Sequence, residues 1–177
     1  MIYKAAQLPV DCNKADVVSA LAKLQRHIYI FRNRRSWRIA LENQCKAAGI
    51  PFRQLPLDMP VRWNSTYTMI KTACDLQVPI TAVCATQDFD PSVRPFSLTD
   101  GDWLLLNSML KLFIIFVQPC KKLQGDIYPT MNYAIPQYLR LLNKLQLLQV
   151  AWGENSALGL ACTAVYNKLN DYYTTIR

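Results

Sequence analysis

Apolar side chains recur at every third or fourth position along most of this chain, and this spacing limits the fold more than any other feature of the sequence. In residues 15–32 the repeat is carried by Val17, Leu21, Leu24, Ile28 and Phe31, which would share one face of an α-helix. The same spacing predicts further helices over residues 34–48, 65–86 with a restart at Pro79, 99–117, 135–145 and 156–172. No strand pattern and no internal repeat interrupts it. With 177 residues, the chain is predicted to be one all-α domain, a helical bundle or part of one.

Three stretches are expected within this single domain of residues 1–177. Residues 15–86 hold the basic helices, residues 87–97 form a linker, and residues 98–177 form a more apolar helical part. The linker assignment rests on Asp88, Asp90, Pro91 and Pro95, which leave little to bury.

Turn and capping residues predict where several helices begin and end. Gly49, followed by Pro51, should end the second helix, and the three prolines between residues 50 and 62 favour a loop there. Asn64 or Ser65 is expected to cap the next helix, whose buried face would be Tyr67, Ile70 and Cys74. Thr99 and Asp102 resemble a capping box, Pro119 should kink or end the long apolar helix, and Asn155 or Ser156 should begin the last one.

Positive charge is concentrated in one segment. The chain carries 20 basic and 12 acidic side chains, and residues 23–62 contain nine of the basic ones against two acids, which gives 9 − 2 = +7. Arginines dominate near the junction of the first two helices, and guanidinium groups suit phosphate oxygens. Two interpretations stay open, a nucleic-acid contact or a merely solubilising face, and the candidate phosphate contacts are Arg32, Arg34, Arg35 and Arg38.

The residues needed for catalysis or metal binding are scarce. His27 is the only histidine and is expected to be a partly exposed surface residue, so no His-based triad or zinc site can be assembled. The six cysteines form no CxxC pair and are expected to be core thiols in a reducing compartment. Closely spaced acids such as Asp100 and Asp102 are expected to serve a helix dipole rather than Mg²⁺. We therefore expect neither an enzyme nor a bound cofactor or metal.

The sequence also predicts a soluble chain. Residues 1–10 contain no apolar run long enough for a signal peptide. The most apolar stretch, Trp103 to Val117, is interrupted by Asn107, Ser108 and Lys111, and a membrane span needs about 20 apolar residues. No membrane association is expected.

Residues 55–67 read Leu-Pro-Leu-Asp-Met-Pro-Val-Arg-Trp-Asn-Ser-Thr-Tyr, and this string resembles the RWNSTY region of hAT-superfamily transposases, including their BED-finger relatives. Four other stretches resemble the sequence of the same family before or after its RWNSTY region. They are the basic stretch before the string, the Leu98 to Leu123 region with Trp103, the Tyr128-Pro129-Thr130 string and residues 168–173. The resemblance extends in order over residues 18–176.

The resemblance implies a helical domain inserted into an RNase H-like core, in a family that cleaves DNA with two metal ions. Arg62 and Trp63 match the Arg-Trp pair of that insertion, whose tryptophan stacks near an extruded base, so Trp63 is expected to contact DNA and Arg62 a phosphate. A core position beside Tyr67 is the alternative for Trp63. None of the family's three catalytic acids aligns with an acid here, so we expect a catalytically incomplete fragment without transposase activity.

Two functional hypotheses follow from these features. The first is a catalytically inactive helical fragment of a hAT-like transposase that binds transposon-end or hairpin-like DNA and, by analogy with the family, works in the nucleus. The second is a helical protein-interaction module, or a relic without function, whose partner would bind an exposed apolar face of the Trp103 to Val117 helix.

Overall fold

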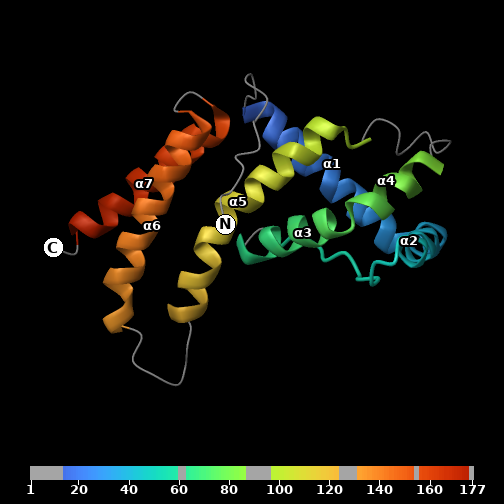
Figure 1. Cartoon of the computed structure of the whole chain (residues 1–177), viewed down its shortest axis with the longest axis horizontal. Helices are drawn as coiled ribbons and strands as arrows, with labels where there is room; N and C mark the ends of the chain where they lie inside the picture. Colours follow the sequence, from blue (N-terminus) through green and yellow to red (C-terminus); the bar gives the residue numbers. More distant parts are fainter. Residues whose placement is uncertain (1–13, 60–62, 87–96, 124–130, 154–155, 176–177) are drawn as a thin grey trace. The chain divides into compact units, whose positions relative to one another are not determined.

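The structure is a computed structural model, and it describes residues 14–59, 63–86, 97–123, 131–153 and 156–175. All regular secondary structure in these ranges is α-helical, which confirms the predicted fold class. The helices, labelled in Figure 1, are α1 (Lys14–Asn33), α2 (Arg35–Ala47), α3 (Trp63–Asp75), α4 (Gln77–Thr86), α5 (Asp100–Leu123), α6 (Met131–Trp152) and α7 (Ala157–Thr175).

The chain forms two compact units, an N-terminal unit of residues 15–107 and a C-terminal unit of residues 108–177. The boundary falls inside α5, between Asn107 and Ser108. The linker expected at residues 87–97 stays a prediction. Residues 87–96 of that linker lie outside the described part of the chain. The first turns of α5 therefore belong to the N-terminal unit and the rest of the helix to the C-terminal unit.

The N-terminal unit is held by an apolar core to which α1 to α4 all contribute, and α4 packs against α2 and α3. At the corner between α1 and α2, the rings of Phe31 and Trp37 meet edge to face, with centroids 5.5 Å apart and planes at 76°. The most deeply buried large side chains of this unit include Leu24, Ile28, Leu41, Met69, Ile70, Leu76 and Ile80.

The buried face of α3 differs from the one predicted. Met69, Ile70 and Ala73 are fully buried, whereas Tyr67 and Cys74 are only half-buried. The buried face of α3 is therefore rotated by about one residue from the predicted face. Of the three residues predicted to be buried, Ile70 alone lies in the core.

Two predicted capping arrangements are present. The Asp102 carboxylate accepts the Thr99 backbone N–H at 2.8 Å, and the Asp102 N–H donates to the Thr99 hydroxyl at 3.2 Å, so the capping box at the start of α5 is confirmed. At α7, the Ser156 hydroxyl accepts the Gly159 N–H at 3.0 Å. Gly49 follows α2 with φ of 66°, as expected for a residue that ends a helix.

Two other helix ends differ from the predictions. Helix α3 begins at Trp63, so Asn64 and Ser65 lie within its first turn and neither caps it. Helix α5 continues through Pro119 to Leu123, so Pro119 does not end this helix, and the kink that was the other possibility stays a prediction.

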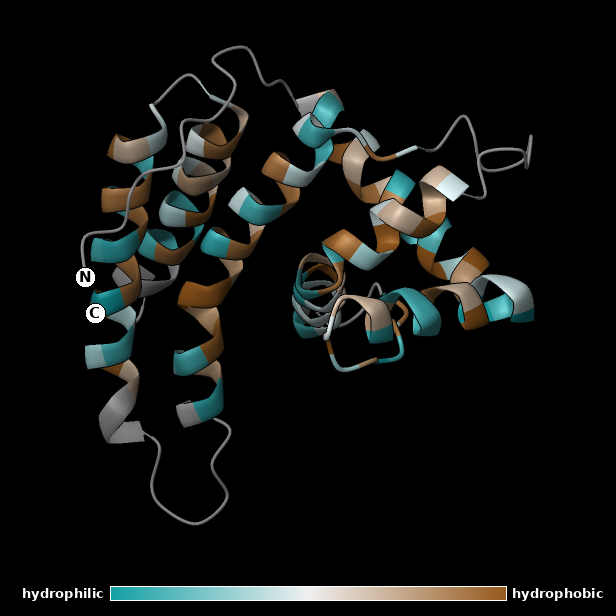
Figure 2. Ribbon diagram, turned by 45° about the vertical axis from the view of Figure 1, so that its right-hand side comes forward, coloured by the Kyte–Doolittle hydropathy of each residue, from teal (hydrophilic) through white to brown (hydrophobic). Residues whose placement is uncertain are grey.

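The C-terminal unit is built on the antiparallel pair α6 and α7, which run side by side (Figure 1). Its core contains Leu112, Ile115, Leu141, Leu145 and Cys162. The Tyr138 hydroxyl donates to the Leu169 carbonyl and ties the two helices together. Figure 2 shows hydrophobic and hydrophilic stretches alternating along the helices, as expected for amphipathic helices.

Among the described residues, α5 is the one helix long and apolar enough to cross a membrane. Its window from Asp100 to Lys121 has a mean hydropathy of 1.6, and 44% of it is buried within the protein. Core helices of soluble proteins have the same properties, and Trp103, Leu105 and Leu106 are all buried here.

Candidate nucleic-acid interface

Three arginines lie at the junction between α1 and α2. Arg34 occupies the N-cap position of α2, and Arg35 and Arg38 follow in its first turns. All three side chains are exposed, because the opposite side of the helix is buried through Trp37 and Leu41. We call Arg34, Arg35 and Arg38 the arginine patch.

The start of α2 adds to the positive charge of this patch. Its first turn contains no acidic residue, and Arg34 makes no side-chain capping bond. The N-terminal end of a helix carries a partial positive charge from its backbone N–H groups. An anion that approaches the arginine patch would therefore be attracted both by the guanidinium groups and by the partial positive charge at the start of α2.

Arg32, the fourth predicted phosphate contact, has a structural role. Its guanidinium group is half-buried and donates to the Leu55 carbonyl at 3.0 Å. Leu55 itself is buried, with 2% of its surface exposed. Arg32 thus fixes the loop after α2 to the end of α1, and the structure does not group it with the arginine patch.

The two motif residues expected at the centre of the interface lie at the edge of what the structure describes. Arg62 is outside the described residues. Trp63 is the first residue of α3, and its side chain is likewise outside them. Their proposed DNA contacts therefore stay predictions.

The neighbouring motif residues Ser65 and Thr66 organise a loop. Both hydroxyl groups donate to the Asp58 carboxylate, at 2.9 and 2.8 Å. The Gln25 amide of α1 donates to the other carboxylate oxygen at 2.9 Å, and the Ser65 hydroxyl also accepts the Met59 N–H at 2.8 Å. Asp58 therefore connects α1, the loop and the first turn of α3.

Sequence reasoning did not single out Asp58 or Gln25. Asp58 was visible only as an acid inside the motif string, and Gln25 lies 33 positions away from it. No periodicity or spacing rule links such a pair, so only the folded chain reveals it.

An ion pair joins α1 to the start of α5. The Lys23 ammonium lies 2.9 Å from the Asp102 carboxylate, and both side chains are largely shielded from solvent. Burial by itself raises the pKa of Asp102, but hydrogen bonds from Thr99 and the Lys23 charge outweigh it, so the pKa lies below the usual 3.8. Asp102 is therefore ionised at neutral pH and serves both as cap and as ion-pair partner.

His27 is buried, contrary to the expectation of a surface residue. Only 1% of its surface is exposed, and its Nδ1 donates to the Lys23 carbonyl at 2.9 Å. Its Nε2 has no hydrogen-bond partner. Burial lowers the pKa of His27 below the usual 6.5, and the bond to Lys23 opposes this only in part. The ring is thus a neutral core residue.

The cysteines behave as apolar or half-buried thiols. Cys45 and Cys162 are fully buried, and burial raises the pKa of Cys74 to about 12 and that of Cys84 to about 11. Cys12 lies outside the described residues. Within the described ranges, no group of three His, Cys, Asp or Glu side chains is placed to hold a metal ion.

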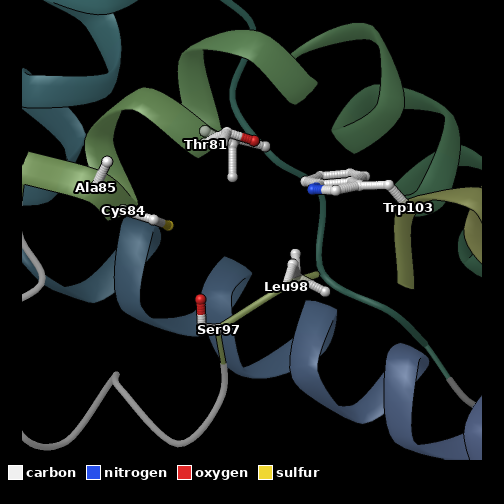
Figure 3. A pocket seen from close by; sticks show the side chains of 7 residues that line it. Thr81, Cys84, Ala85, Ser97, Leu98 and Trp103 are labelled. Carbon is white, nitrogen blue, oxygen red and sulfur yellow. The ribbon is translucent and has the colours of Figure 1, made fainter. Parts of the chain in front are cut away.

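A pocket of about 190 Å³ opens between α4 and the start of α5 (Figure 3). Cys84 and Ser97 point their sulfur and oxygen atoms into it, and the Trp103 indole lies at its far side. Among the described residues, the lining contains no carboxylate, imidazole or ammonium group, so these residues supply no group that could transfer a proton near neutral pH.

Taken together, the N-terminal unit is a basic helical domain whose polar side chains organise its motif region. One family description matches the chain, the ZBED1 RNase-like helical domain, over residues 15–112. The match covers just over half of the chain and nearly coincides with the N-terminal unit. The chain therefore belongs to the ZBED1 RNase-like helical domain family, a transposase-derived class. No curated protein and no solved structure gave a match.

Proposed function

We propose that the chain is a DNA-binding helical domain whose arginine patch contacts the phosphate backbone. The observation that carries this proposal is the exposure of three neighbouring arginines at the start of α2, in a segment of charge +7. Phosphate contacts of this kind supply most of the sequence-independent affinity of DNA-binding proteins. A nuclear location follows from such a role.

The acids of the N-terminal unit support the proposal. Asp58 accepts three side-chain bonds, Asp75 lies 2.8 Å from Lys71 and 3.4 Å from Arg53, and Asp102 pairs with Lys23. These carboxylates are engaged away from α2. Glu42, which lies on α2 four residues after Arg38, pairs with Lys46 at 3.3 Å. The three arginines of the patch outnumber this one acid of α2.

Arg62 and Trp63 are proposed as the part of the interface that responds to DNA form. An indole face that stacks on an unpaired base contributes about 1 to 3 kcal/mol. A hairpin or a distorted transposon end offers such a base, whereas an intact duplex does not. The arginine patch would then supply the affinity for DNA, and Trp63 would supply the selectivity for hairpin or distorted DNA over an intact duplex.

We further propose that this chain binds DNA without cleaving it. Phosphodiester hydrolysis by two metal ions needs carboxylates that converge on the metals. A nuclease assay with Mg²⁺ or Mn²⁺ should show no cleavage. Metal-dependent cleavage that co-purifies with the chain and disappears with a point variant would contradict this.

The test of DNA binding is fluorescence anisotropy of the full chain against hairpin and plain duplex DNA across a salt series. The double variant Arg35→Gln, Arg38→Gln should lower the slope of log affinity against log salt by about 2, since each phosphate contact contributes roughly 0.9. The matched control is Arg53→Gln, Lys71→Gln, which removes the same charge from the same unit at residues paired with Asp75. It should leave the slope nearly unchanged.

The same titration includes Trp63→Ala. The expected result is loss of the preference for hairpin over duplex with the salt slope retained. Equal slopes in the arginine variant and its control would refute the arginine patch as the binding surface.

A second candidate function is a protein-interaction module, and one observation favours it. Ile135, Leu139, Leu147 and Val150 lie on one side of α6 and are 59%, 44%, 71% and 79% exposed. This apolar face lies on α6 and not on the Trp103 to Val117 segment, where Ile114 is the one exposed apolar side chain and the others are buried or half-buried. Sedimentation of the full chain, with and without Leu147→Gln, Val150→Gln, tests whether this face drives association.

A further inference from the structure

A second basic region lies in the C-terminal unit, outside the segment that the charge count singled out. Residues 108–177 contain seven basic and three acidic side chains, a net charge of 7 − 3 = +4. Of those acids only Asp171 is among the described residues. In this unit the basic side chains outnumber the acidic ones by more than two to one.

Two of these cations border a pocket of about 180 Å³ between α5 and α6. Arg140 and Lys144 lie four residues apart on α6, so they share one face of the helix, and both are exposed. Gln118 and Pro119 of α5 line the opposite side. The pocket is wide enough for several waters, since one water needs about 10–15 Å³ of such space.

A buried amide completes the lining. Gln137 precedes Arg140 by three residues on the same face of α6, and only 5% of its surface is exposed. Gln137 therefore adds a neutral hydrogen-bonding group to a pocket that two cations border.

We propose that this pocket binds one phosphate-type oxyanion, held by the Arg140 guanidinium, the Lys144 ammonium and the N–H groups of the Gln137 amide. Guanidinium groups bind phosphate oxygens through paired hydrogen bonds, and an ammonium adds a compact point charge. The amide donates a further hydrogen bond. The anion is either a phosphodiester of nucleic acid or the phosphate of a small molecule, and the chemistry at the site is the same for both.

The primary test is the thermal unfolding of the full chain in inorganic phosphate against chloride at equal ionic strength. A ligand that binds the folded state raises Tm with the logarithm of its concentration above Kd. Wild type should show this rise. Arg140→Gln, Lys144→Gln should weaken phosphate binding at least about tenfold, because hydrogen bonds to charged groups are lost.

Two further variants separate binding from folding. Gln137→Leu keeps the approximate shape and removes the amide without changing the charge, so it should weaken phosphate binding while leaving Tm in chloride about unchanged. Lys111→Gln, Lys121→Gln is the matched control, which removes two charges of α5 outside the pocket lining. It should retain the phosphate response.

A duplex without terminal phosphates identifies the source of the anion. If the duplex suppresses the effect of inorganic phosphate, the site takes the nucleic-acid backbone, and if it does not, the site takes a small phosphate. Either result supports the site. No phosphate-specific rise in Tm, or an equal rise in all variants, would overturn it. Arg35→Gln, Arg38→Gln should leave this response intact, so failure of the α2 interface and failure of this pocket are distinguishable.

Discussion

The two units of this chain are stabilised by different means. In the N-terminal unit, polar side chains connect segments that are distant in sequence, as Lys23 does with Asp102 and Gln25 with Asp58. In the C-terminal unit, an apolar cluster and close backbone packing between α6 and α7 predominate. The comparison shows how the first unit keeps a basic surface. Asp58 and Asp102 are engaged in internal bonds, while the side chains of Arg34, Arg35 and Arg38 are exposed.

The largest effect is expected at Gly159 of the C-terminal unit, where a neighbouring backbone carbonyl leaves no room for a side chain. A Cβ atom at Gly159 would lie 2.0 Å from the Gly153 carbonyl oxygen, so Gly159→Ala should destabilise this unit by about 3 kcal/mol. Urea unfolding followed by hydrogen exchange measures the loss for each unit separately.

Gly101→Ala is the control for this change. Its Cβ would meet only the Thr99 hydroxyl, at 3.6 Å, so it should be tolerated. If Gly159→Ala lowered the protection of both units equally, the separation into two kinds of stabilisation would be wrong.

The second effect concerns the polar ties of the N-terminal unit. Asp58→Ala removes the acceptor of three side-chain bonds and should cost about 2 kcal/mol, because their donors are left without partners. Thermal unfolding checks the size of the loss. Asp58→Asn, which keeps one carbonyl acceptor, should recover part of it, whereas equal losses in both variants would argue against a hydrogen-bonding role.

A third prediction uses pH. The pKa of His27 is lowered in the folded state, so the unfolded chain binds a proton more readily and folding stability is complete above about pH 6.5. It decreases as the pH falls from 6.5 towards the folded-state pKa. Measurement of unfolding free energy between pH 7 and pH 5 should show this decrease in wild type, and His27→Leu should flatten it.

The Asp102 carboxyl contributes in a different range. Its folded-state pKa lies below 3.8, so its contribution is present above that value and is lost only at lower pH. A decrease in stability between pH 7 and pH 5 that persists in His27→Leu would therefore exclude His27 as its source.

The smallest effect is expected on the exposed face of α6. Leu147→Gln, Val150→Gln should change unfolding free energy by less than about 0.5 kcal/mol, since both side chains are largely exposed. Leu145→Gln, at a fully buried position of the same helix, is the contrasting variant and should be strongly destabilising. A large loss in the double variant would show that this face is covered in the folded chain.

Local sequence signals predicted the helices well because their causes are local. The apolar repeat placed α1 within one residue of its observed ends, and Gly49, Ser156 and the Thr99 to Asp102 pair marked the boundaries that the structure shows. Such signals depend on backbone dihedral angles and on hydrogen bonds a few residues apart.

The remaining features depend on contacts that no local pattern contains. Ser65 has the side chain of a helix cap, yet its hydroxyl bonds the 58–59 loop instead. His27 is polar, yet it lies next to Ile28 on the side of α1 that the core covers, and that position was the one available signal. Arg32 differs from Arg35 only in what the folded loop brings to it. Residue type alone therefore predicted that this segment is basic, but not which of its arginines are exposed and which is bound to a loop.

The Lys23 and Asp102 pair also bears on how the chain folds during its synthesis, because its partners are 79 residues apart. At translation rates of about 5 to 20 residues per second, Asp102 follows Lys23 by roughly 4 to 16 seconds. Throughout that interval α1 has emerged without the carboxylate that neutralises its lysine. The N-terminal unit is therefore completed late, when the first turn of α5 leaves the ribosome, and until then its core depends on apolar contacts among α1 to α4.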